Sequence, residues 1–459
     1  MGRSVLSKDV LPEGTYYHRI SNRHYAIANG VVRRHQKGAN GAELNVLEKP
    51  VNLAIGSGNH AYTPIHRTPL GKLIELPVTW YTGEKAWAMS PGYDRPDHLG
   101  FRRPITPECL FCHAAYPDTP AATPRAIDCV RCHGDTGAHL RRPQRGSILN
   151  PARLPPDRQL DICLQCHLET ASSGFPDSLR LSGRDVFSYR PGEPLAAYKA
   201  YFDRADHAPR FEINHAGYRM LESRCFAESK GALTCTTCHD PHTARARNAC
   251  AGCHKTVERT HGGGNPDCAS CHMPKRPAGD APHVEMTDHR IAKPGPAERH
   301  DPAPYSGPLV AFANRANAAM LRQAQALHFA RTNGSAAAWK RTEATTANLA
   351  ALADALMREG RHEEALPVID KVLKADPDHV TALNGLAVYH GMRGRTEQAL
   401  AILERARAAD PDHPLTWINL GVAHEALGDR ALALDRYNEA VRLQPDSQEA
   451  RRRRAAVSQ

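Results

Sequence analysis

The chain has 459 residues, enough for two or three domains, and a formal net charge of +10. It is poor in aromatic residues, at 6 %, and rich in proline and glycine, with 35 and 33 of them. It has no hydrophobic run long enough to cross a bilayer and no basic patch interleaved with aromatics, so we expect neither a transmembrane segment nor a nucleic-acid partner.

Residues 1–100 are predicted to be rich in β-structure. Strand-like runs at 16–20, 24–28 and 31–33 lie between short turn signals, and a further run covers 73–81. Pro77 lies inside that last run and favours an edge position, because proline has no N–H to give to a neighbouring strand. A glycine-rich turn at 56–60 ends on His60, either a solvated loop histidine or a metal ligand.

Between residues 101 and 292 the pentapeptide Cys-x-x-Cys-His occurs six times. The cysteines are Cys109, Cys112, Cys129, Cys132, Cys163, Cys166, Cys235, Cys238, Cys250, Cys253, Cys268 and Cys271, and the histidines are His113, His133, His167, His239, His254 and His272. This pattern is typical of c-type haem attachment, in which two thiols one helical turn apart add to the haem vinyl groups and the histidine binds the iron. The sequence therefore predicts six covalently attached haems, whose propionates give some of the Lys and Arg residues a partner.

Other interpretations of these cysteines explain less. A single Cys-x-x-Cys is also half of a zinc site or a redox-active pair, but four-cysteine zinc sites would leave six histidines without a role. A disulfide framework suits small secreted domains rather than a chain of this length. The thirteenth cysteine, Cys225, is a buried small residue or a thiolate haem ligand.

Each iron has one more axial position, and several histidines outside the motifs are candidates for it. His242 is three residues from His239, too close to reach the opposite face of the same porphyrin, so as a ligand it must serve a neighbouring haem. The other candidates are His60, His139, His261, His283 and His289. For each, the alternative is a surface histidine or one that hydrogen-bonds to a propionate. Ligation by two histidines leaves no open position on the iron and gives a low potential compared with Met/His ligation.

The last third of the chain has a different pattern. Residues 274–308 are rich in Pro and Gly, which predicts a linker, and 293–345 are expected to hold this linker and a helical lead-in. From 346 to 459 a 34-residue period appears, in the prolines at 377, 411 and 445, the alanines at 365, 399 and 433, and Ile369, Leu403 and Tyr437. This period resembles the tetratricopeptide repeat, a helix–turn–helix unit, and predicts three repeats plus a capping helix. The groove of such an array either binds a protein partner or only stiffens the molecule.

We therefore expect a multidomain protein. Residues 1–100 form a β-containing N-terminal region, 101–292 an irregular, partly helical domain packed around haems, and 346–459 an all-α solenoid. The chain resembles the multihaem c-type cytochromes of bacteria that carry a C-terminal tetratricopeptide domain. The resemblance rests on the segments 56–60, 89–98, 235–242, 268–275 and 286–289. The resemblance implies an electron carrier in the periplasm or facing the envelope, with mostly bis-histidine haems. It also implies that an export signal and one further haem motif precede the segment at Met1.

Three functions follow from these expectations. The first is an electron relay whose repeat domain docks periplasmic or envelope redox proteins. The second is a redox enzyme that reduces nitrite, hydroxylamine or a sulfur oxyanion at one haem with an open position. The third is a scaffold for a larger envelope complex, and association between copies of the chain is left open. The many histidines and the absence of a variant motif such as Cys-x-x-Cys-Lys favour the relay.

Overall fold

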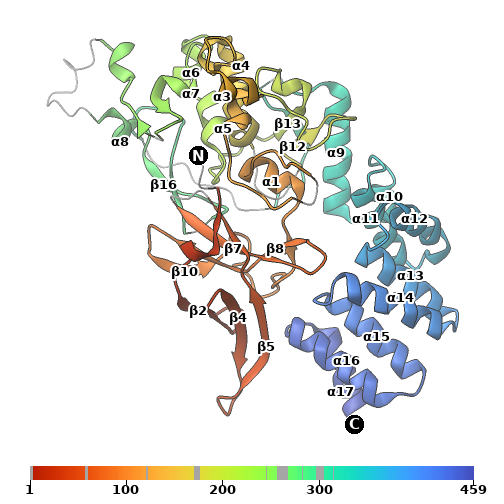
Figure 1. The fold of residues 1–459 in the computed structure, drawn as a ribbon. Coiled ribbons are helices and arrows are strands. Elements are labelled where there is room, and N and C mark those ends of the chain that lie inside the picture. The colour runs from red at the N-terminus through yellow and green to blue at the C-terminus, as the bar shows by residue number, and fades with distance from the viewer. Residues whose placement is uncertain are drawn as a thin grey trace.

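The computed structural model describes residues 4–56, 60–119, 122–169, 176–243, 245–255, 267–281, 283–295, 304–313 and 315–459. Figure 1 shows a β-rich N-terminal part, a middle part of short helices and hairpins, and a curved array of helix pairs that ends at the C-terminus. In this view the N-terminal sheets lie below the middle part and to the left of the helix array.

The N-terminal part holds two antiparallel sheets. The four-stranded sheet is a meander of β2 (Gly14–His18), β3 (Arg23–Ala28), β4 (Val31–Lys37) and β5 (Glu43–Pro50). The seven-stranded sheet contains β1 (Val5–Ser7), β6 (Leu53–Gly56), β7 (Ala61–Arg67), β8 (Leu73–Glu75), β9 (Val78–Tyr81), β10 (Ala86–Met89) and β11 (Arg103–Pro104), and in it β7 pairs with both β8 and β9. The β-containing N-terminal region is therefore confirmed.

Local chemistry explains two features of these sheets. Asn29 and Gly30 have φ of 53° and 70° in the tight turn between β3 and β4, a conformation that Asn and Gly adopt at little cost. The run 73–81 is two strands rather than one edge strand. It breaks at Leu76 and Pro77, where the ring removes a backbone donor, and the Pro77 carbonyl accepts from Ser90 N–H at 2.9 Å.

The middle part is built from short elements joined by loops. Its helices are α1 (Pro107–His113), α2 (Val130–His133), α3 (Gly137–Arg141), η2 (Pro151–Arg153), α4 (Pro156–His167), η3 (Leu195–Ala197), α5 (Ala216–Leu221), α6 (Arg224–Glu228), α7 (Cys235–Cys238), η4 (Cys250–Gly252) and α8 (Cys268–His272). Its strands are β12 (Ser178–Arg180), β13 (Lys199–Arg204), β14 (His239–Asp240), β15 (Arg245–Ala246), β16 (Lys275–Pro277), β17 (Glu285–Thr287) and β18 (Leu309–Ala311). β16 pairs with β17, and β18 joins β13, so parts of the segment expected as a linker belong to folded sheets.

The C-terminal part is a stack of antiparallel helix pairs. After α9 (Ala318–Asn333) and α10 (Ala336–Trp339) come α11 (Thr346–Arg358), α12 (His362–Ala375), α13 (Val380–Met392), α14 (Thr396–Ala409), α15 (Pro414–Ala426), α16 (Arg430–Leu443) and α17 (Gln448–Ser458). The three alanines that recur every 34 residues are all buried, and each recurring proline lies two residues beyond the end of a second helix. Three repeats and a capping helix are confirmed.

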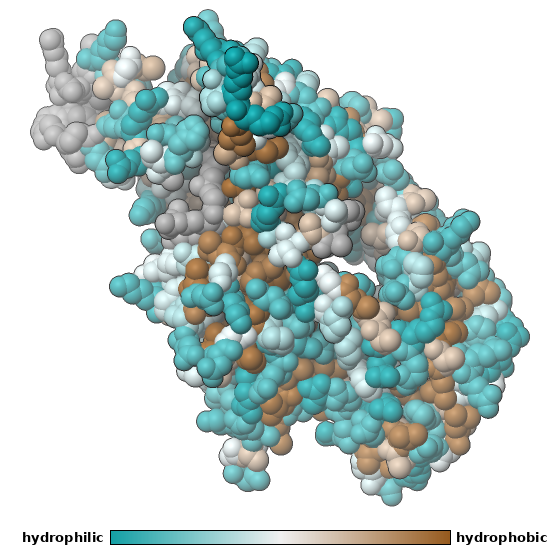
Figure 2. All heavy atoms as spheres, viewed as in Figure 1, coloured by the Kyte–Doolittle hydropathy of each residue, from teal (hydrophilic) through white to brown (hydrophobic). Residues whose placement is uncertain are grey.

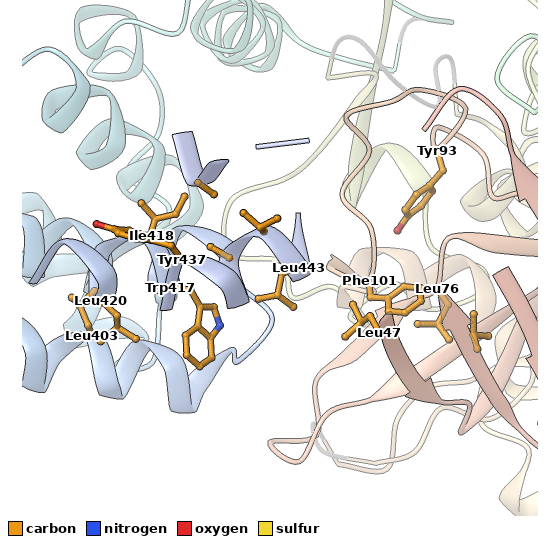
Figure 3. Close-up of a cluster of buried hydrophobic side chains, with 14 of the residues drawn as sticks. Leu47, Leu76, Tyr93, Phe101, Leu403, Trp417, Ile418, Leu420, Tyr437 and Leu443 are labelled. Atoms are coloured by element: carbon orange, nitrogen blue, oxygen red, sulfur yellow. The ribbon is translucent and has the colours of Figure 1, made fainter. Parts of the chain in front are cut away.

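The repeat array packs on the N-terminal sheets through buried arginine. Arg34 on β4 is fully buried, and its guanidinium donates to the carbonyls of Arg442 and Leu443 at 2.5 and 3.1 Å and of Asn45 at 2.9 Å. The first two are among the last carbonyls of α16, which have no partner within the helix, so Arg34 caps that helix from another domain. Buried apolar side chains of the sheets and of the last two repeats form one cluster, in which Leu443 lies on the side facing Leu47 (Figure 3).

Two ion pairs reinforce this contact. Arg23 pairs with Asp446, and Lys49 pairs with Asp412 in the loop before α15. Figure 2 shows a mostly hydrophilic outer face, with hydrophobic residues gathered over the N-terminal sheets and between the helices of the array. Within the residues that the structure describes, no helix combines the length and the apolar character needed to cross a membrane.

Candidate functional site

The six Cys-x-x-Cys-His motifs all lie on single helical turns. Four of these histidines are the last residues of α1, α2, α4 and α8, and α7 ends one residue before His239. In the fifth motif, on η4, His254 N–H still donates to the Cys250 carbonyl at 2.9 Å. Local caps explain why such short turns form: Asp267 accepts from Ser270 N–H before α8, and Thr234 and Thr237 make a reciprocal capping box at α7. The two thiols of each motif are thus one turn apart, the spacing that attachment to two vinyl groups requires.

Two contacts between motif thiols bring different motifs together. None of the thirteen cysteines, all of which lie in the described part of the chain, forms a disulfide. The hydrogen bond to Cys166, together with burial, raises the pKa of the Cys112 thiol, and the same bond lowers the pKa of Cys166. The hydrogen bond to Cys235 and burial likewise raise the pKa of the Cys163 thiol. The third motif therefore lies beside the first and the fourth.

Two buried donors near these thiols have no hydrogen-bond partner among the described residues. One is Nη1 of Arg131, a residue inside the second motif that is 2 % exposed and lies between the rings of Phe111 and Tyr116 at 4.5 and 4.4 Å. The other is the hydroxyl of Tyr201. An unsatisfied buried donor is costly, so these groups fit a partner that brings acceptor oxygens, as haem propionates do. The net positive charge predicted that some Lys and Arg residues pair with propionates. The sequence does not show which of these arginines is buried.

The imidazoles of His113 and His167 are reached by solvent, although the surrounding protein removes part of their hydration. Both side chains are open to solvent, yet burial by surrounding protein lowers the pKa of each. The pKa of His167 is lowered further by the nearby imidazoles of His289, His113 and His239. The lowered pKa values leave both imidazoles neutral at pH 7, which is the protonation state that binds a metal.

Among the motif and candidate histidines that the structure describes, three donate a ring proton to a backbone carbonyl, a contact that His66 on β7 also makes with Pro50. Nδ1 of His133 lies 2.8 Å from the Leu149 carbonyl, Nδ1 of His272 lies 2.8 Å from that of Ala292, and Nδ1 of His289 lies 2.9 Å from that of Thr287. A carbonyl only accepts, so Nδ1 carries the proton in each case and Nε2 keeps its lone pair. This is the arrangement usual for metal-binding histidines in proteins.

Two motif histidines face histidines from outside the motifs. The ring centres of His133 and His242 are 6.0 Å apart with planes inclined by 16°, and those of His239 and His289 are 6.1 Å apart and inclined by 30°. His242 thus faces the histidine of the second motif rather than His239, its neighbour in sequence. A ligand only three residues from His239 must serve another haem, and this placement agrees with that requirement.

The remaining candidates lie elsewhere. The ring of His283 packs at 45° against that of Tyr81, with ring centres 4.9 Å apart, and its Nδ1 lies 3.3 Å from Glu84. These contacts with the N-terminal sheet favour a structural role. His139, on α3, contacts the Ser147 hydroxyl through Nδ1 at 2.8 Å. His60 precedes β7 in the same sheet, where its carbonyl accepts from Thr82 N–H. His261 and the core of the turn at 56–60 lie outside the described residues.

A cage of metal ligands is a different arrangement from these pairs. Across the described ranges, no group of three or more His, Cys, Asp or Glu side chains is placed to hold a metal ion. A structural zinc site takes four such ligands, whereas an iron already held by a porphyrin takes one or two. Cys225, the thirteenth thiol, is partly buried, and burial raises its pKa, which disfavours the thiolate form that would bind iron.

Comparison with known families concerns the C-terminal part. Two tetratricopeptide-repeat models match residues 350–414 and 392–457. The C-terminal part of the chain is a tetratricopeptide-repeat domain. Similar solved structures include the tetratricopeptide protein YrrB (18% identity, 29% of this chain and 73% of that chain, TM-score 0.26). The Sgt2 repeat domain of Aspergillus fumigatus is 21% identical over 25% of this chain and 76% of that chain, with a TM-score of 0.23. The first repeat domain of human RPAP3 is 20% identical over 25% and 89%, with a TM-score of 0.24.

Proposed function

We propose that the protein is a multihaem c-type cytochrome that relays electrons, and that its tetratricopeptide domain docks a protein partner. The observation that carries the proposal is the set of six Cys-x-x-Cys-His turns, whose cysteines form no disulfides and in which the second cysteine is followed by an imidazole. The motif cysteines would hold the haems, the motif histidines would bind the irons, and Arg131 would pair with a propionate. When bound, haem supplies reversible one-electron redox chemistry.

The histidine pairs support a relay over an enzyme. An enzyme that reduces nitrite, hydroxylamine or a sulfur oxyanion needs an iron with an open position for substrate. His242 and His289 lie opposite motif histidines, where a second imidazole would fill that position. Filled positions suit electron transfer, since no bond to iron has to form or break.

The repeat domain supports a docking role. Such arrays present an extended concave surface, and tetratricopeptide domains commonly bind peptide partners. Periplasmic or envelope redox proteins are the partners that a relay requires. Covalent attachment of c-type haem takes place outside the bacterial cytoplasm, so haem-loaded protein would share their compartment. The docked C-terminal helices would fix the groove relative to the rest of the molecule.

The experiment is a pyridine haemochrome assay on the full chain, exported behind a bacterial signal peptide in a host that matures c-type haem. We expect about six haems per chain. Replacing Cys129 and Cys132 by alanine should remove one haem, and Cys225→Ser, the matched control, should remove none. Protein that carries no covalent haem would contradict the proposal.

Electron paramagnetic resonance (EPR) of the oxidised protein separates relay from enzyme. Low-spin signals that nitrite and cyanide leave unchanged are expected of the relay. A high-spin signal that shifts on addition of either ligand would instead favour the enzyme.

A further inference from the structure

The two facing histidine pairs have the spacing of two ligands on one metal. A metal–imidazole bond is about 2 Å long, so imidazoles on opposite sides of one iron have ring centres about 6 Å apart. The pairs His133–His242 and His239–His289 have 6.0 and 6.1 Å. For comparison, His24 and His35, which stack directly across β3 and β4, are 5.0 Å apart.

The protonation pattern agrees with this spacing. One member of each pair, His133 and His289, donates its Nδ1 proton to a backbone carbonyl and therefore presents Nε2 as an acceptor. Each pair also combines one motif histidine with one histidine from outside the motifs, as two ligands of one haem must. All four side chains are at least partly exposed, which leaves the space around them open.

The short β14–β15 hairpin holds His239 and His242 so that they face different partners. His239 pairs with Ala246 in the hairpin, and Asp240 accepts from the His242 N–H at 2.9 Å and fixes the turn. Arg247 donates to the carbonyls of Thr236 and Thr237 at 3.0 and 2.9 Å and ties the hairpin to α7. Three residues span at most about 10 Å between Cα atoms, so whatever the two histidines bind must be close together.

A second hairpin carries His289 back to the fourth motif. β16 begins three residues after His272, the histidine of the sixth motif, and pairs with β17, so that His289 follows at the end of the hairpin. The buried carboxylate of Asp288 anchors this end, with Arg219 at 2.9 and 3.0 Å and Arg276 at 2.6 Å. The bond from His272 to Ala292 joins the sixth motif to the same segment.

We propose that His133 and His242 are the axial ligands of the haem on the second motif, and that His239 and His289 are those of the haem on the fourth. This inference rests on the proposed function. It orders the relay: the strap 239–242 links the second and fourth haems, and the β16–β17 hairpin links the fourth to the sixth. Electrons pass between the second and fourth haems as direct neighbours, although His133, which ends the second motif, and Cys235, which begins the fourth, are 102 positions apart in the sequence.

The test is spin-state counting by EPR and by CO binding on exported, haem-loaded protein. His242→Ala should convert one haem in six to high spin and create one CO site per chain, His289→Ala should do the same, and the double variant should give two. His283→Ala, the matched control in the same segment as His289, should change neither reading. His242→Met should restore a six-coordinate iron with a raised potential, because Met/His ligation raises it.

The outcomes separate this inference from the proposed function. The pyridine haemochrome count should remain about six in every variant. Six haems that all stay low-spin in His242→Ala or His289→Ala would overturn the ligand pairs and leave the cytochrome intact. No haem in the parent protein would overturn both. The side chain of His242 is 78% exposed, so its loss should not prevent folding, and thermal unfolding of the full haem-loaded chain checks this.

Discussion

Replacing Arg34 by leucine should detach the repeat domain from the N-terminal sheets. Arg34 makes three hydrogen bonds to carbonyls, two of them at the end of α16. Burial lowers the pKa of its guanidinium to about 10, because desolvation disfavours the charged form. Part of the free energy gained from the three hydrogen bonds therefore only compensates the cost of this desolvation. Leucine leaves the carbonyls of Arg442 and Leu443 without this donor, and each buried acceptor that loses its hydrogen bond costs about 1–3 kcal/mol.

We therefore expect the free energy of unfolding to fall by about 3 kcal/mol, measured by urea denaturation. Hydrogen exchange at the end of α16 should speed up at the same time. Arg33→Leu is the control, since this neighbour on β4 forms only half-exposed ion pairs with Glu43 and Glu48 and should cost less than about 1 kcal/mol. Equal stability of the Arg34 and Arg33 variants would refute the reasoning.

Three further changes test other parts of the structure. Gly421→Val should lower the free energy of unfolding by about 3 kcal/mol, measured by circular dichroism melting, because the added Cβ would collide with the Tyr437 ring. Gly428→Ala does not serve as a control, because the φ of Gly428 is positive and alanine would be strained there. Asp288→Asn should loosen the β16–β17 hairpin. Although burial alone would raise the pKa of Asp288, its arginine partners hold it below the usual value, so its contribution should be present at neutral pH and vanish as pH falls below about 4 in denaturation curves. Burial and the charge of Arg23 lower the pKa of His98 to about 2, so the unfolded chain binds a proton that the folded chain does not. Stability should fall as pH drops below about 6.5, and His98→Gln should weaken this dependence.

The sequence predicted those parts of the fold that depend on local pattern. The 34-residue period identified the repeats because Ala365, Ala399 and Ala433 occupy equivalent close contacts between helices, and each proline ends a helix at the same place. The motif turns were predicted for the same reason, since Cys-x-x-Cys-His places its own residues one turn apart. Most strands of the first sheet followed from alternation and turn residues.

The parts that sequence analysis missed depend on distant partners. Nothing in the sequence around Arg34 or Arg23 indicates their partners, which lie more than 400 residues later, at Leu443 and Asp446. The proline-rich stretch after 274 was expected as a linker, but the pairing of β16 with β17 is set by residues on both sides of a turn. His283 and His289 looked equivalent as candidate ligands. Only the folded chain distinguishes them, because one lies against Tyr81 and the other faces His239.

The central claim is that twelve cysteines hold six haems, and intact mass spectrometry of the exported, denatured chain tests it most directly. The account predicts a mass that exceeds that of the mature polypeptide by six haems and survives denaturation, because thioether bonds are covalent. A chain at the mass of its polypeptide alone, or one whose metal is lost on denaturation, would contradict it.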